Sequence, residues 1–243
     1  MAAEFSPLEQ FEIKRIVPIH IGGVDISFTN SAVFMCVAVV LVTALMVLST
    51  RNARLVPTRW QSIPELGYEF VAGMIQQNVG KEGMQYFPFI FTLFMFVLAG
   101  NLLGMVPYTF TYTSHIIVTF AMAIVIFIGV TAIGLKRHGL HFLSLFAPKG
   151  VPWILLLLLV PIEMISYFIR PFTLSIRLFA NMLAGHAILA VFASFVAVLG
   201  ILGIAPLAMD VAFMLLEFLV AALQAYIFTI LTCLYLNDAI HLH

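Results

Sequence analysis

Charged residues are scarce in this sequence. Of its 243 residues, Asp, Glu, Lys and Arg make up 9%, whereas hydrophobic residues make up 63%. A globular domain in water needs a larger polar surface than this composition provides. The formal net charge at pH 7 is zero, and without a basic excess the chain is not expected to bind nucleic acid. The composition therefore predicts an integral membrane protein that contacts the lipid bilayer along much of its length.

Cysteine is nearly absent, and the two that occur, Cys36 and Cys233, lie in apolar stretches near opposite ends of the sequence. A buried thiol in such surroundings acts as a small hydrophobic side chain, and no CxxC or Cys/His spacing predicts a disulfide or a metal site. The sequence contains no GxxxxGK motif, so nucleotide binding through a P-loop is not expected. We therefore predict a non-catalytic chain with no cofactor and no metal ion.

The N-terminal segment lacks the positive charge of a cleavable signal peptide. Glu4, Glu9 and Glu12 precede the first apolar stretch instead, so we expect this stretch to remain in the mature protein. Internal repeats of the kind that two-fold transporters carry are also missing, as are low-complexity tracts. The expected organisation is a single transmembrane domain over residues 1–243.

Long uncharged stretches predict the first membrane-spanning helices. Residues 26–50 carry no charge, and a helix of this length, at about 1.5 Å per residue, exceeds the ~30 Å hydrocarbon core. Residues 83–135 are long enough for two helices, at about 86–107 and 114–135, joined by a short aromatic turn that we expect at the membrane interface. Residues 60–80 mix apolar and charged side chains at helical spacing, which predicts an amphipathic helix on the membrane surface. An ordinary solvated loop is the alternative.

The last third of the chain is apolar almost without interruption from residue 151 to residue 199. A helix of this length would be more than twice as long as the bilayer is thick. Two crossings would leave Arg170 and Arg177 on the non-cytoplasmic face, against the positive-inside rule. We therefore predict one long tilted helix that bends at Pro161 and Pro171.

A glycine-rich turn over residues 200–206 then leads into a return helix at about 207–236. The predicted fold class is an all-α, multi-pass membrane protein with a long tilted C-terminal hairpin and one amphipathic surface helix. Lys and Arg gather in two loops, over residues 51–59 and 136–149. By the positive-inside rule these loops and the C-terminus face the cytoplasm, while the N-terminus and the aromatic turn face outward.

Ionisable side chains inside a bilayer are costly and rare, so each one in the predicted hairpin is a candidate functional residue. They form two stripes with seven-residue spacing, one on each helix. On the outgoing helix Glu163, Arg170 and Arg177 fall seven residues apart, with Ser166 and Thr173 on the same side. On the return helix Asp210, Glu217 and the amide Gln224 are also seven apart.

Distance from the turn sorts these residues by depth. Counted from residue 202, Arg177 and Gln224 are nearly equidistant, and so are His186 and Glu217, so each pair should lie side by side in an antiparallel hairpin. The His186–Glu217 pair should lie about 12 Å nearer the outer face than the arginine, and Glu163 should lie nearer the cytoplasmic face.

This order has a chemical meaning. Arginine stays protonated, so it cannot relay a proton, but it repels cations and favours the ionised form of a nearby carboxylic acid. Glu163, His186 and Glu217 can relay protons. A relay on each side of a fixed positive charge predicts two half-channels that do not meet, bridged by a moving carboxylate on a partner subunit.

Structural interpretations remain open for every candidate. Arg177 would extend to the interface, Glu163 and Arg170 would form a structural ion pair, and His186 with Glu217 would be a satisfied buried hydrogen bond. The remaining candidates have equally simple interpretations, as interhelical hydrogen bonds (Asn181 and Gln224), a solvated residue near the turn (Asp210) and an interfacial residue beside the aromatic turn (His115).

The segment RLFANMLAGH, residues 177–186, with Glu163 before it and LQAY, residues 223–226, after it, resembles the signature of the a subunit of F-type ATP synthases, called subunit 6 in mitochondria. The resemblance covers essentially the whole chain and is strongest over residues 161–238. It implies a proton-translocating stator subunit whose partners are the rotating c ring, the peripheral-stalk b subunits and the rest of the complex.

The resemblance also implies residue roles. Arg177 would face the c ring with Asn181 and Gln224 as polar neighbours. Glu163 would line the half-channel toward the side where ATP is made, while His186 and Glu217 would line the path by which protons reach the ring. Some bacterial members have the acid and the imidazole in the opposite order.

The opening EQFEIKR, residues 9–15, looks alphaproteobacterial, which favours a bacterial inner membrane over the mitochondrial inner membrane. The main alternative function is a secondary transporter, against which the missing repeat argues. A second alternative is an intramembrane enzyme with His138, His141 or His186 as metal ligands, although His138 and His141 resemble part of a solvated basic loop.

Overall fold

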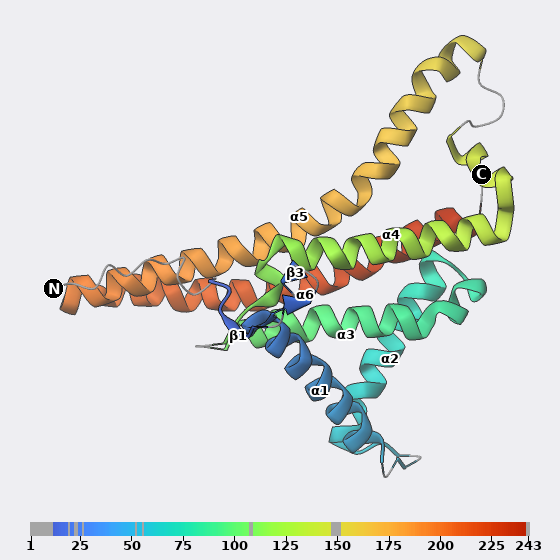
Figure 1. Cartoon of the computed structure of the whole chain (residues 1–243). Helices are drawn as coiled ribbons and strands as arrows, with labels where there is room; N and C mark the ends of the chain where they lie inside the picture. Colours follow the sequence, from blue (N-terminus) through green and yellow to red (C-terminus); the bar gives the residue numbers. More distant parts are fainter. Residues whose placement is uncertain are drawn as a thin grey trace.

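The structure is a computed structural model, and it describes residues 12–18, 20–21, 24–25, 27–51, 53–54, 56–106, 109–146 and 152–241. Helices dominate these residues, as the sequence predicts (Figure 1). The α-helices are α1 (Asn30–Thr50), α2 (Arg59–Asn78), α3 (Phe87–Gly104), α4 (Ile116–His138), α5 (Trp153–Leu199) and α6 (Ile204–Ile240). Short 3-10 helices connect them: η2 (Lys81–Tyr86), η3 (Tyr112–Ser114), η4 (Gly139–Phe146) and η5 (Gly200–Gly203).

Five segments are long and apolar enough to cross a membrane: Asn30–Thr50, Lys81–Gly104, Ile116–His138, Leu155–Leu199 and Ile204–Ile240. The all-α, multi-pass fold class is therefore confirmed. Two short antiparallel strand pairs precede α1, namely β1 (Arg15–Val17) with β4 (Phe28–Thr29) and β2 (His20–Ile21) with β3 (Val24–Asp25). Because β4 ends at Thr29, α1 begins four residues later than the sequence predicts.

The core lies where α3, α4, α6 and the second part of α5 run side by side, whereas α1 and α2 diverge from this bundle (Figure 1). Side chains from all four helices are fully buried there, including Ile90 and Val97 of α3, Ile126 of α4, Met182 of α5 and Phe228 of α6. On α1, by contrast, only Ser31 and Ala38 are buried. The core is therefore built from the bundle and from the part of α2 that packs against it, and α1 packs at its edge.

The α2 helix confirms the helical interpretation of residues 60–80 over the solvated loop. Thr58 caps its first turn by accepting a hydrogen bond from the Gln61 backbone N–H at 3.4 Å. Val71 and Ile75 are buried against the bundle, while Trp60 and Leu66 remain exposed. A helix that buries one apolar face and exposes further apolar side chains suits a lipid interface, and its location on the membrane surface stays a prediction.

The α5 helix is continuous over 47 residues, so the single long helix is correct and the two-crossing alternative is wrong. It contains Pro161 and Pro171, each of which removes one backbone hydrogen bond and favours a bend. Figure 1 shows that the first part of α5 turns away from α6, whereas the second part lies along it. The turn between the helices is shorter than predicted, because only Gly200–Gly203 interrupts them and Pro206 is tolerated in the first turn of α6.

The turn between α3 and α4 differs from its prediction. We expect it at the interface from sequence, but Phe110, Tyr112 and Thr113 are buried. Two glycines of α3 make this possible, since a Cβ on Gly100 would lie 2.3 Å from the Tyr112 hydroxyl and one on Gly104 would lie 2.4 Å from Thr111 Oγ1. We call residues 109–115 the buried turn. Residues 107–108, like Lys149 and the N-terminal Glu4 and Glu9, lie outside the described residues.

Candidate functional site

Between Tyr167 and His186, α5 has one face in the core and one face outside it. Tyr167, Leu174, Leu178, Met182 and His186 are buried, with spacings of three, four and seven residues that keep them on one side of the helix. Most of the predicted polar stripe lies outside this buried row. Ser166, Arg177 and Asn181 are exposed, and Glu163 is partly exposed.

Arg177 and Gln224 do not share an environment. Arg177 is exposed, whereas the Gln224 side chain is only 5% exposed on the face of α6 that packs into the bundle. No hydrogen bond or ion pair between described residues involves Arg177. Equal distance from the turn therefore gives these two residues a similar position along the hairpin, but the rotation of each helix separates their side chains.

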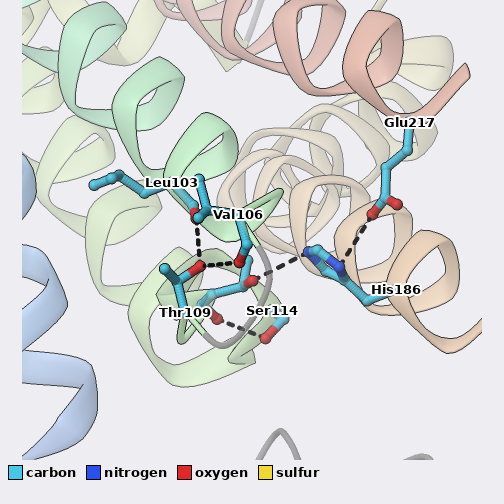
Figure 2. A network of polar contacts seen from close by, with 7 residues as sticks. Leu103, Val106, Thr109, Ser114, His186 and Glu217 are labelled. Atoms are coloured by element: carbon cyan, nitrogen blue, oxygen red, sulfur yellow. Dashed lines mark hydrogen bonds and ion pairs between the residues drawn. The ribbon is translucent and has the colours of Figure 1, made fainter. Parts of the chain in front are cut away.

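His186 and Glu217 do meet. The imidazole Nδ1 lies 3.4 Å from Glu217 Oε1, and the two residues are 9% and 5% exposed (Figure 2). This distance allows an ion pair when the imidazole is protonated. Gly185 makes the approach possible, because a Cβ there would lie 2.6 Å from Glu217 Oε1. The sequence thus predicts the pairing correctly from the count of residues along the hairpin.

A third residue, which the sequence analysis missed, completes the group. Thr111 of the buried turn places its hydroxyl 3.1 Å from His186 Nε2. Ser114 holds the same turn by donating to the Thr111 carbonyl at 2.6 Å, and both residues are buried (Figure 2). The signal was the run of Thr and Ser in an otherwise apolar sequence, but nothing in that run shows that the turn folds inward to reach α5.

Further polar atoms are buried near this group without a hydrogen-bond partner among the described residues. They include both carboxylate oxygens of Glu217, Oδ1 of Asp210, Oδ1 of Asn101, Oγ1 of Thr113 and Nε2 of His115. Asn101 is fully buried and donates to the Ala221 carbonyl at 3.0 Å, one helical turn from Glu217. Unpaired buried polar atoms are costly and few in folded proteins. Glu217 belongs to the group, Thr113 is two residues from Thr111, and Asn101 contacts the turn of α6 next to Glu217, so the group has a polar interior that simple helix packing does not require.

His115 and Asp210 extend this interior in two directions. His115 precedes α4 and stacks on Phe110 with ring centroids 4.9 Å apart. Burial lowers the pKa of its imidazole, so the ring is neutral at pH 7. Asp210 lies on α6 two helical turns before Glu217 and is partly exposed, with its Oδ1 buried, so its interpretation as a solvated residue near the turn stays open.

Arg170 belongs to a separate group. Its Nη1 donates to Asp238 Oδ2 at 2.8 Å, and its guanidinium lies 5.3 Å from the Tyr167 ring and 5.0 Å from the Tyr235 ring. The sequence suggests Glu163 as its ion-pair partner, and this alternative is wrong because Asp238 of α6 fills that position. Asp238 was missed because the return helix was expected to end at residue 236.

The metal-site alternative gains no geometric support. Among the described residues, no three His, Cys, Asp or Glu side chains gather as a metal site would require. His138 instead lies with Nε2 3.0 Å from the Ile240 carbonyl oxygen, which connects the end of α4 to the end of α6.

Comparison with known proteins gives one consistent family. The family model described as the ATP synthase A chain matches residues 32–237. The ATP synthase subunit a of Paramagnetospirillum magneticum is 57% identical over 245 residues, which cover 98% of this chain and 99% of the relative. That of Rhodospirillum rubrum is 57% identical over 239 residues, covering 98% and 99%. That of Mesorhizobium japonicum is 56% identical over 249 residues, covering 99% of both chains.

Proposed function

Because the chain belongs to the family of ATP synthase a subunits, a proton-translocating part of the membrane sector, we propose that it forms two offset half-channels that load and unload protons on a rotating c ring. The chain would be the stator against which the ring turns. We propose no nucleotide site on this chain, and the coupling to ATP would come from the rest of the complex.

One observation carries this proposal: the permanent cation, Arg177, and the imidazole of the titratable pair, His186, lie on opposite sides of α5. Arg177 is exposed on one side of α5, whereas His186 is buried on the opposite side of this helix, beside Glu217 of α6. An exposed guanidinium at this position suits contact with a carboxylate on a neighbouring subunit. The buried His186–Glu217 pair suits a proton path that stays separate from the contact between Arg177 and the ring until it reaches the surface of the hairpin.

In this mechanism a proton enters from the outer side through the polar interior around the buried turn. It passes to the His186–Glu217 pair and from there to the ionised carboxylate of the ring. The neutral carboxyl can then leave the vicinity of Arg177 and enter the lipid, since only a charged group pays a large desolvation penalty there. After nearly one rotation the carboxyl meets the second half-channel.

Glu163 would receive the proton in that second half-channel. It lies in the third turn of α5 and is partly exposed. Arg177 favours the ionised form of the ring carboxylate that comes beside it, so it drives release on one side and blocks direct proton leakage between the two paths. Ser166 and Asn181, exposed on the same face of α5, would contact the ring.

The other partners follow from the same proposal. The diverging helices α1 and α2 leave apolar side chains exposed, among them Val40, Leu48, Trp60 and Leu66, and these surfaces would contact lipid and the membrane segments of the b subunits. The membrane would be a bacterial inner membrane, with the N-terminus outside and the C-terminus in the cytoplasm.

The test is purification of the tagged chain from membranes, followed by reconstitution into vesicles. A rotary stator subunit should copurify with a ring of small hairpin subunits, and the vesicles should acidify on addition of ATP. A secondary transporter would purify without a ring and would move protons only with a co-substrate. Purification without a ring under conditions that keep the complex intact would contradict the proposal.

A further inference from the structure

The buried turn makes a specific polar contact with the proton-carrying pair. Thr111 is 6% exposed, and its hydroxyl lies 3.1 Å from His186 Nε2, on the side of the ring opposite the nitrogen that faces Glu217. The two contacts therefore place three side chains in a row, with Thr111 of the turn, His186 of α5 and Glu217 of α6; Figure 2 shows His186 facing Glu217.

We propose that Thr111 is a positioning residue for proton uptake: its hydroxyl fixes the His186 ring so that Nδ1 faces Glu217 in both charge states of the imidazole. This inference rests on the proposed function, because it concerns how the same pair receives its protons. It adds a residue of the α3–α4 connection to a site otherwise built from the hairpin.

A hydroxyl suits this position because it can both donate and accept. When the imidazole is neutral with its proton on Nδ1, Thr111 donates to Nε2. When the ring is protonated, the Nε2 N–H donates to Thr111 Oγ1. Transfer of the Nδ1 proton to Glu217 Oε1 breaks one N–H bond, forms one O–H bond, and leaves a neutral ring whose Nε2 N–H still donates to Thr111.

The surroundings of Thr111 are built to hold its hydroxyl in place. A Cβ on Gly104 would lie 2.4 Å from Thr111 Oγ1 and 2.6 Å from its Cγ2, so α3 accepts this side chain only because residue 104 is glycine. Ser114 fixes the Thr111 carbonyl, and the Tyr112 hydroxyl donates to the Phe96 carbonyl at 2.8 Å. The Thr109 hydroxyl donates to the Leu103 carbonyl, so the turn is attached to α3 on both sides of the residue that contacts His186.

The first experiment measures passive proton flow through membranes stripped of the catalytic sector and energised with a potassium diffusion potential. Thr111→Val keeps the shape of the side chain and removes the hydroxyl, so the flow per assembled complex should fall about tenfold, the ratio that corresponds to the loss of one buried hydrogen bond. Thr111→Ser keeps the hydroxyl and should retain most of the flow.

Matched controls distinguish the loss of the Thr111–His186 hydrogen bond from a general disturbance of helix packing. Thr119 is equally buried, but its hydroxyl donates within α4 to the Ile116 carbonyl at 3.1 Å, so Thr119→Val should conduct normally. Gly104→Ala should reproduce the loss without altering Thr111, whereas Gly129→Ala, where a new Cβ meets nothing within 4 Å, should not. Where Thr111→Val fails to assemble, the pair Thr111→Ser and Thr111→Ala, which differs only in the hydroxyl, decides the question.

A reference variant distinguishes this inference from the proposed function. Glu217→Gln should block proton flow if the pair carries protons. If Glu217→Gln blocks the flow while Thr111→Val and Thr111→Ala conduct like the unmodified protein, the role of Thr111 is wrong and the proposed function stands. If Glu217→Gln conducts normally, the proposed function itself is wrong.

Discussion

Arg177 is the exposed ionisable side chain of the described part of the hairpin, whereas Glu163, Arg170, Asp210, His186 and Glu217 are all partly or fully buried. A guanidinium does not lose its proton in a protein, so its charge persists even where it faces the lipid or a partner. A cation in that position needs a compensating anion. In the proposed function, a carboxylate of the c ring provides this anion each time the ring advances by one subunit.

Replacing Arg177 with Ala should abolish ATP-driven proton pumping in inverted vesicles and ATP synthesis, because nothing then favours ionisation of the ring carboxylate or blocks a leak between the half-channels. Arg177→Lys should restore little, since a lysine can lose its proton in a poorly solvated site. Thr173→Ala serves as the control for the surface change, because Thr173 is exposed one helical turn before Arg177 and its hydroxyl donates to the Arg170 carbonyl of the same helix. Substantial pumping by Arg177→Ala would contradict the assigned role.

Substitutions of His186 and Glu217 test whether the two residues act as one relay. The two groups share one depth and lie within 3.4 Å, so their titrations are coupled and each single substitution leaves one polar group buried alone. His186→Ala and Glu217→Gln should each slow ATP-driven pumping by roughly tenfold or more. The double exchange His186→Glu with Glu217→His keeps both groups, and it should recover more activity than either single variant. An exchange no better than the worse single variant would show that the pair is not a shared relay.

At the scale of elements, contacts between the helix ends decide how the hairpin is held. Arg170 lies one residue before Pro171, the second proline inside α5. Its ion pair with Asp238 and its contacts with the Tyr167 and Tyr235 rings attach that region to the end of α6. Proline weakens the helix locally, so this group fixes the direction in which α5 continues toward Glu163.

Asp238→Asn should therefore lower the thermal stability of the purified complex, by about 1–2 kcal/mol, because the partly buried guanidinium loses its charged partner. The ion pair of Arg137 with Glu82, which is more exposed, provides the matched control, and Glu82→Gln should change stability by less than about 1 kcal/mol. The comparison of melting temperatures in detergent checks this prediction. Equal effects of the two substitutions would mean that the Arg170 group has no special role.

Some features of these elements can be predicted from the sequence, and others cannot. Uncharged length predicts the five long apolar segments, and seven-residue spacing predicts which hairpin residues share a face, because both follow from helix geometry alone. The burial of Tyr112 and the contact of Thr111 with His186 could not be predicted, since they depend on the space that Gly100 and Gly104 leave on α3. The partner of Arg170 was missed for the same reason: the packing of one helix end on another is not visible in the spacing of either helix.

For the molecule as a whole, the number of crossings and the placement of charge together predict an orientation. Five apolar segments of sufficient length would leave the two termini on opposite sides of the membrane if each crosses once. Arg51, Arg54, Lys136 and Arg137 adjoin the ends of α1 and α4, and the positive-inside rule predicts that these ends face the cytoplasm. The N-terminal strands and the α5–α6 turn would then lie outside.

Single cysteines labelled from each side of sealed vesicles test this orientation. Ile13, Arg54 and His241 are exposed and lie before α1, after α1 and after α6, so cysteine at these positions should react without disturbing the core. Both native thiols must first be replaced, since Cys36 is exposed and would react as well. A membrane-impermeant maleimide added to right-side-out vesicles should label position 13 and spare positions 54 and 241, and inverted vesicles should give the opposite pattern. The two preparations control for each other, because a site that is merely unreactive fails in both. Labelling of positions 13 and 241 from the same side would require an even number of crossings and would contradict the arrangement on which the two half-channels depend.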